Sequence, residues 1–171
     1  MNRILIAGIG NIFCGDDAFG CEVARALLRV PLPPEAQVFD FGIRSYDLAY
    51  ALTEENEAVI LIDATPRGEL PGATCLLEID PAALSNFGVL PPDGHSLNPV
   101  SVLQMAQNLG GVNGKIYLVG CEPAVLDSEE GEIGLSEPVR QAIPQAVEMI
   151  ATLCREISGA KEKTTAGLAP A

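Results

Sequence analysis

The chain has 171 residues, of which 48% are hydrophobic and 19% are charged, and its formal net charge is -13. This length fits one domain with a sizeable core, since about 100–200 residues per domain is usual. The acidic charge argues against nucleic acid as a partner, because nucleic acids select basic surfaces, and no apolar run approaches the roughly 18 residues that would span a bilayer.

The first element is a buried strand, RILIAGI (3–9), which runs into the stretch GIGNIFCGDDAFG (8–20). This stretch begins like a nucleotide-binding turn, but its glycine spacing fails G-x-G-x-x-G, with Phe13 where a small residue is needed. The adjacent carboxylates Asp16 and Asp17 would also repel the phosphate that a helix N-terminus attracts. The loop therefore predicts a cation site. A helix should begin near Asp17 and bury residues at helical spacing, namely Phe19, Val23, Ala26, Leu27 and Val30.

The rest of the chain alternates between predicted strands and predicted helices. Four further apolar runs predict strands: AQVFDFG (36–42), EAVILIDA (57–64), ATCLLEI (73–79) and KIYLVGC (115–121). Helical spacing predicts helices over 45–55, from about Pro99 to Leu109, and from about Pro138 to Ile157. In the last of these, Pro144 should cause a kink or mark the true start. This alternation is typical of an α/β sheet covered on both faces.

The link between the third and fourth strands is the most informative connection. From Asp63 to Ala73 it is too short for a crossover helix, since parallel strands need a dozen or more residues between them. The fourth strand should therefore run antiparallel to the third. The sequence predicts a three-layer α/β/α fold with a twisted, mostly parallel five-stranded sheet containing one antiparallel strand, as one domain over residues 1–158. The small and polar residues 159–171 are expected to form a disordered tail.

Three polar residues should meet at the carboxyl ends of the parallel strands, where open α/β sheets usually bind their ligands. Asp17 follows the first strand, Asp63 ends the third, and His95, the only histidine, lies in the loop before the helix from Pro99. Two carboxylates and an imidazole suit a borderline divalent ion. The Irving–Williams order places nickel above iron, manganese and cobalt for such ligands, without excluding zinc. A metal site is therefore predicted at the carboxyl ends of the parallel strands.

Each of these residues also has a purely structural interpretation. Asp16 or Asp17 can cap the first helix, one of them capping while the other points outward. Asp63 can be a strand-end turn residue, and His95 can be a loop residue with a local hydrogen bond. Cys14 is either an additional soft ligand or a small buried hydrophobe, and the second interpretation is favoured. The coincidence of three such residues at one mouth favours the metal site.

The motifs together resemble the hydrogenase maturation endopeptidases, which trim the C-terminal extension from the large subunit of nickel-iron hydrogenases. One motif is G-x-G-N followed by an acidic pair and Ala-x-Gly, over residues 8–20. The others are Asp63-Ala64 at the end of the third strand, and the histidine loop, with His95, running into the N-P-V-S-V-L segment from Asn98. The resemblance covers nearly the whole chain except the tail.

This resemblance implies a hydrolase: a metal-guided, aspartic-type or metal-dependent endopeptidase whose metal-contacting and catalytic residues are Asp17, Asp63 and His95. The expected partner is the large-subunit precursor, which supplies its own nickel, with cadmium or zinc as surrogates in the free enzyme. Two departures stand out: many relatives carry Glu where this chain has Asp17, and a D-G-G-T-like turn reads DFGIR over residues 40–44 here. With no signal-peptide features, a cytoplasmic monomer without a membrane partner is expected.

Two other functions are weighed against the protease. In a receiver-type signalling domain, Asp16 and Asp17 would bind magnesium and Asp63 would accept a phosphoryl group. That domain expects a lysine after the last strand, where this chain has Cys121-Glu122-Pro123. A nucleophilic pair of Cys14 and His95 ranks below the metal site but is not excluded by the sequence.

Overall fold

The computed structural model describes residues 3–87, 97–126 and 133–166. Its strands are β1 (Arg3–Ile9), β2 (Ala36–Gly42), β3 (Asn56–Ala64), β4 (Thr74–Ile79) and β5 (Lys115–Cys121). They form one five-stranded sheet in the order β2-β1-β3-β5-β4. β4 pairs antiparallel with β5, and the other pairings are parallel. The predicted mixed sheet is confirmed, and its antiparallel strand lies at one edge, beside β5.

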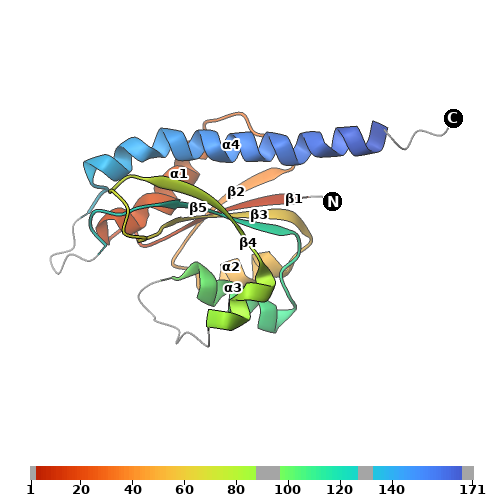
Figure 1. Cartoon of the computed structure of the whole chain (residues 1–171), viewed down its shortest axis with the longest axis horizontal. Coiled ribbons are helices and arrows are strands. Elements are labelled where there is room, and N and C mark those ends of the chain that lie inside the picture. The colour runs from red at the N-terminus through yellow and green to blue at the C-terminus, as the bar shows by residue number, and fades with distance from the viewer. Residues whose placement is uncertain (1–2, 88–96, 127–132, 167–171) are drawn as a thin grey trace.

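Helices cover both faces of this sheet. They are α1 (Phe19–Leu27), α2 (Ser45–Thr53), α3 (Pro99–Leu109) and α4 (Glu137–Ala166), with short 3-10 helices η1 (Gly15–Ala18) and η2 (Pro81–Phe87). In Figure 1, α1 and α4 lie on one face of the sheet and α2 and α3 lie on the other. The three-layer α/β/α architecture is therefore confirmed.

The first helix differs from its prediction. The chain forms η1 first, so α1 begins two residues after Asp17, and it ends at Leu27. Of the residues expected to be buried, Ala26 is half-buried and Val30 lies beyond the helix, whereas Ala24 is fully buried. The side of a short helix that packs on a sheet is a single stripe, and Ala24 lies on that stripe in place of Ala26.

The last helix is longer than predicted. It begins at Glu137, passes through Pro144 and continues to Ala166, so Pro144 does not mark its start and the expected end near Ile157 is wrong. The residues after Gly159 include Ala, Lys and Glu, which favour helix. The division into a domain over residues 1–158 and a disordered tail over 159–171 stays a prediction, although 159–166 continue the helix.

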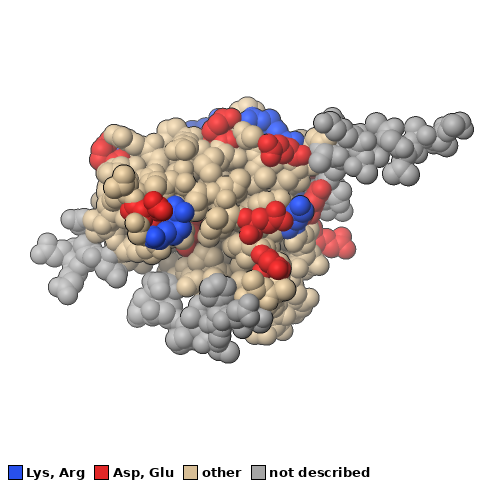
Figure 2. Space-filling view, viewed as in Figure 1, with Lys and Arg blue, Asp and Glu red and all other residues tan. Residues whose placement is uncertain are grey.

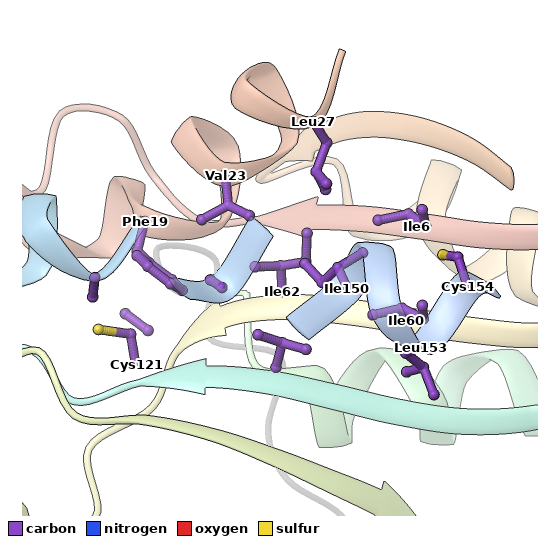
Figure 3. Close-up of a cluster of buried hydrophobic side chains, with 14 of the residues drawn as sticks. Ile6, Phe19, Val23, Leu27, Ile60, Ile62, Cys121, Ile150, Leu153 and Cys154 are labelled. Atoms are coloured by element: carbon purple, nitrogen blue, oxygen red, sulfur yellow. The ribbon is translucent and has the colours of Figure 1, made fainter. Parts of the chain in front are cut away.

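The predicted apolar stripe of α4 packs into the larger of two hydrophobic cores. Val139, Ile150 and Leu153 are buried there, and Ile143 and Val147 pack against them half-buried. Figure 3 shows this core between the sheet and the two helices, with labelled side chains from β1 and β3 (Ile6, Ile60, Ile62), α1 (Phe19, Val23, Leu27) and α4 (Ile150, Leu153, Cys154). Because burial of this apolar surface is favourable, it fixes α1, and with it the acidic loop, against the sheet.

The cysteines contribute to packing and form no disulfide. All five are free thiols, as expected from their number and spacing. Burial raises the pKa of Cys21 to about 12 and that of Cys121 and Cys154 to about 11. A thiol must ionise to act as a nucleophile, so these three are inert at neutral pH.

Charged side chains of both signs lie in small groups on the surface. On the face shown in Figure 2, Lys and Arg side chains lie beside Asp or Glu. Ion pairs of this kind include Arg3–Glu54 and Arg155–Glu148. Exposed pairs each contribute little to stability. Among the described residues, no helix combines the length and the apolar composition needed to cross a bilayer.

Candidate functional site

Close packing of α1 against the ends of β1 and β3 positions the acidic loop. A Cβ atom at Gly20 would lie 2.2 Å from the carbonyl oxygens of Ile9 and Ile62. One at Gly10, whose φ is +136°, would lie 1.7 Å from the carbonyl oxygen of Asp17. Only glycine leaves room for these approaches. The glycines of the G-x-G-N and Ala-x-Gly motifs therefore hold Asp17 directly above the ends of both strands.

Gly20→Ala should lower the free energy of unfolding by about 3 kcal/mol, because the new Cβ must displace the backbone of two strands and overpacking costs are of this order. Gly159→Ala is the matched control. It has nothing within 4 Å of its Cβ position, and alanine favours helix by about 1 kcal/mol over glycine. Urea unfolding of both variants checks this. A Gly20→Ala protein as stable as the parent would contradict the packing argument.

Asp17 lies half-buried in η1, and a backbone N–H group of the same loop holds its carboxylate. Its Oδ2 accepts the backbone N–H of Asn11 at 2.7 Å, and its own N–H donates to the carbonyl of Cys14 at 3.0 Å. The Oδ1 of Asn11 accepts the N–H of Phe13 at 3.0 Å. The loop is thus closed by short local hydrogen bonds around a fixed carboxylate.

Asp63 is the penultimate residue of β3, and its side chain is buried beside Asp17. The residue is 6% exposed, and its Oδ1 has no hydrogen-bond partner within the part of the chain that the structure describes. Burial, followed by the negative charge of Asp17, raises the pKa of Asp63 well above its usual value, against a smaller lowering by the N–H of Ala64. The structure therefore brings the two predicted carboxylates together, in an arrangement that favours a bound proton or cation.

Asp63→Asn should increase stability near neutral pH, and the gain should disappear in acid. The carboxyl ionises near its usual value of 3.8 in the unfolded chain but at a higher pH in the folded one. Its favourable contribution is therefore complete below the unfolded pKa and is lost as the pH rises through the folded pKa. Asparagine carries no charge at any pH and escapes this loss.

Urea unfolding across the mildly acidic to neutral range measures this effect. Glu156→Gln, which neutralises an exposed carboxylate on α4, is the control and should show no such pH-dependent gain. A stability difference between parent and Asp63→Asn that stays constant with pH would contradict the raised pKa of Asp63.

His95 lies outside the described residues, so its place beside the two carboxylates stays a prediction. The helix after it begins at Pro99 as expected, and its N-cap Asn98 accepts the N–H of Val100 at 2.8 Å. Among the residues that the structure describes, no three His, Cys, Asp or Glu side chains gather closely enough to hold a metal. Asp17 and Asp63 therefore form a pair of carboxylates, and their role as metal ligands stays a prediction.

Asp16 does not cap a helix, and this prediction is wrong. It is fully buried, and neither η1 nor α1 has a side-chain cap. Its carboxylate accepts the N–H groups of Ala124 and Val125 at 2.8 and 2.9 Å, and the N–H and Oγ–H of Ser136 at 2.7 and 2.9 Å. Burial raises the pKa of Asp16, but the hydrogen bonds from Val125, Ser136 and Ala124 outweigh it, so the pKa is lowered overall.

Glu122 is a second buried carboxylate whose role the sequence did not reveal. Its Oε2 accepts the N–H of Arg67 at 2.7 Å and its Oε1 that of Gly68 at 3.3 Å. Its backbone also bonds to Gly72 and Ala73, both at 2.8 Å. Glu122 thus ties the link that follows Asp63 in the chain to the end of β5. An acidic residue directly after an apolar strand was the only sequence signal for it.

A groove of about 400 Å³ opens at Gly10 and Asn11, the two residues that contact Asp17. It is lined by Gly10, Asn11, Phe13, Asp40, Ile43 and Arg44, among others. Phe13 and Ile43 are 63% and 58% exposed, which makes the walls apolar. The guanidinium of Arg44 donates to the carbonyls of Asp40 and Phe41, so the turn after β2 is held in place. A groove of this kind can hold an extended peptide with apolar side chains.

Comparisons with known proteins point to one family. A family model described as hydrogenase maturation protease matches residues 21–153. A putative hydrogenase maturation protease of Methanocaldococcus jannaschii is 32% identical over 86% of this chain and 93% of its own length. The hydrogenase 2 maturation protease of Escherichia coli is 30% identical, over 90% of this chain and 92% of its own.

Solved structures of the same kind share the fold. The hydrogenase maturating endopeptidase HybD from E. coli superimposes with a TM-score of 0.72 at 27% identity, covering 90% of this chain and 93% of that one. The NiFe hydrogenase maturation protease HycI from Thermococcus kodakarensis does so with a TM-score of 0.67 at 28% identity, over 90% and 93% of the two chains. With its paired carboxylates at the strand ends, this chain therefore belongs to the hydrogenase maturation protease family.

Proposed function

We propose that this protein is the endopeptidase that recognises the nickel-loaded precursor of a nickel-iron hydrogenase large subunit and removes its C-terminal extension. The observation that carries the proposal is the pairing of Asp17 with the buried carboxylate of Asp63, whose Oδ1 has no partner within the described residues. Two carboxylates held together in this way repel each other unless a proton or a cation lies between them. Membership of the hydrogenase maturation proteases supports the proposal that this cation is the nickel of the substrate.

In this proposal the nickel is part of the substrate, and the protein recognises the precursor by contacting this nickel. Asp17 and Asp63 provide oxygen ligands, and His95 provides the imidazole that completes a set suited to a borderline divalent ion. The hydrogen bond from the Asn11 N–H holds the carboxylate of Asp17 in its place near the ends of the strands. Recognition of the metal at this point would place the precursor backbone over the strand ends, where the protease acts.

The groove at Gly10 and Asn11 would hold the precursor chain next to its metal. Its exposed apolar residues, Phe13 and Ile43, can pack against apolar side chains of the precursor. The turn over residues 40–44 forms one wall of this groove and takes the place of the D-G-G-T-like turn of many relatives. The protein is proposed to act as a monomer in the cytoplasm, on a protein substrate and without a membrane or nucleic-acid partner.

The receiver-domain alternative is not favoured. It needs a lysine after the last strand, but Glu122 occupies this place and uses its carboxylate to hold the backbone at Arg67 and Gly68. It also needs Asp16 as a magnesium ligand, but both oxygens of that carboxylate already accept hydrogen bonds. The pair of Cys14 and His95 stays a second hypothesis for the nucleophile, with Cys14 half-buried at the start of η1.

Incubation with candidate large-subunit precursors tests the proposed function. Each precursor is presented with and without nickel, and mass spectrometry measures the masses of the large subunit and of any released peptide. The nickel-loaded precursor should lose its C-terminal extension as a single peptide. A parallel incubation with acetyl phosphate tests the alternative: a phosphorylated Asp63, together with uncut precursors of every kind, would overturn the protease.

A further inference from the structure

We infer that Asp16 is a positioning residue for Asp17: its buried carboxylate binds the acidic loop to the segment that follows β5 and to the residue that precedes α4. Without these hydrogen bonds, Asp17 would not keep its place beside Asp63. The consequence for cleavage rests on the proposed function, whereas the consequence for the loop itself does not.

Three segments that are distant in the sequence meet at Asp16. Its side chain accepts four hydrogen bonds from Ala124, Val125 and Ser136, and its own N–H donates to the carbonyl of Val125 at 3.0 Å. Both carboxylate oxygens are used, and the residue is 0% exposed. All four donors are uncharged backbone N–H or hydroxyl groups, so the negative charge is stabilised by oriented dipoles. Asp16 therefore fixes the orientation of η1 and does not reach the substrate.

Asp17 is one peptide unit away in the same short helix, so the orientation of η1 decides where its carboxylate points. The carbonyl of Asp17 lies against Gly10, with no room for a Cβ atom, and its Oδ2 is bonded to the N–H of Asn11. A rotation of η1 would break both of these contacts. Catalytic geometry tolerates little movement, since a displacement of about 1 Å can cost about a hundredfold in rate.

The hydrogen bonds of Asp16 depend on its charge and not only on its shape. Asparagine has the same size, but only one of its two terminal atoms accepts hydrogen bonds and the other donates two. In Asp16→Asn, the new NH₂ group must face either the N–H of Ser136, at the position of Oδ1, or the N–H groups of Ala124 and Val125, at the position of Oδ2. At least one hydrogen bond is therefore replaced by a contact between two donors, while the volume of the core is unchanged.

Hydrogen exchange of the Asn11 amide, followed by NMR, reports on the position of Asp17 without any substrate. In Asp16→Asn this amide should exchange at least about tenfold faster than in the parent, because its acceptor is no longer held in place. Its rate is normalised to that of Ile60 in the core of β3, so that a change in global stability cancels.

Glu122→Gln is the matched control for this measurement. It also neutralises a buried carboxylate that accepts backbone N–H groups, but these belong to Arg67 and Gly68. Its normalised Asn11 exchange rate should stay within about twofold of the parent, as expected for an opening that does not include the first loop. Normalised Asn11 exchange in Asp16→Asn that equals that in Glu122→Gln would overturn the inference.

Cleavage of a nickel-loaded precursor provides the second measurement. At a temperature where the proteins are fully folded, Asp16→Asn should lower kcat by about tenfold to a hundredfold, with a smaller change in KM because the groove is intact. Normal kcat in this variant would overturn the positioning role. If the parent protein cuts no precursor, the proposed function fails, and the Asn11 exchange still decides whether Asp16 holds the loop.

Discussion

Asp17→Ala is expected to process a nickel-loaded large-subunit precursor more than about a hundredfold more slowly than the parent protein. Asp17 is proposed to contact the metal, and loss of such a group should exceed the roughly 10- to 100-fold cost of altering a residue that only supports a metal ligand. Asp17→Glu should keep its activity. It retains the carboxylate and introduces the glutamate that the family resemblance leads us to expect at this position. The initial rate of appearance of the shortened large subunit, followed by mass spectrometry, measures both.

The same assay compares variants at the proposed site with a variant elsewhere on the surface. His95→Ala and Asp63→Asn should be as slow as Asp17→Ala, while Glu156→Ala, which removes an exposed carboxylate from α4, should match the parent. Asp63→Asn is the most informative of these, because it should be inactive and yet more stable near neutral pH. Parental rates in both Asp17→Ala and His95→Ala would refute the metal-guided protease.

Asp16→Ala should have a different and equally large effect, on folding. Its removal leaves four donors of Ala124, Val125 and Ser136, all in part-buried hydrogen bonds, without this acceptor. Because these donors are only partly buried, each should cost about 1 kcal/mol, the low end of the usual range, so the free energy of unfolding should fall by about 3 kcal/mol. Chemical denaturation measures this loss directly.

Asn98→Ala is the control for this prediction, because Asn98 is a true N-cap whose Oδ1 accepts the N–H of Val100. Its loss should cost about 1 kcal/mol, as is typical of a cap. If Asp16→Ala were no more destabilising than Asn98→Ala, the hydrogen bonds of Asp16 would not hold the first loop to the start of α4, and this account of Asp16 would be wrong.

The sequence predicted the sheet well because its evidence is local. Each strand is a compact apolar run between polar or glycine-rich links, and the link from Asp63 to Ala73 is too short for a crossover, which determined the direction of β4. The meeting of Asp17 and Asp63 also followed from local information, since parallel strands end at the same edge of a sheet. Both carboxylates lie where the chain leaves such a strand.

The roles of Asp16 and Glu122 were not predictable in the same way. The partners of Asp16 lie 108 to 120 residues further along the chain, and no spacing pattern reveals a contact of that range. A helix cap was the local interpretation, and the long-range hydrogen bonds displaced it. The expected end of α4 near Ile157 is wrong for a different reason: the apolar stripe stops there, but the Ala, Lys and Glu residues that follow favour helix, and the helix continues to Ala166.

Soaking crystals of the protein with cadmium, a nickel surrogate with strong anomalous scattering, tests the central claim that the fold pairs Asp17 and Asp63 to contact a metal. The account predicts an anomalous peak bound by these two carboxylates, with the imidazole of His95 as a further ligand. A peak at other residues, with no metal between Asp17 and Asp63, would contradict it.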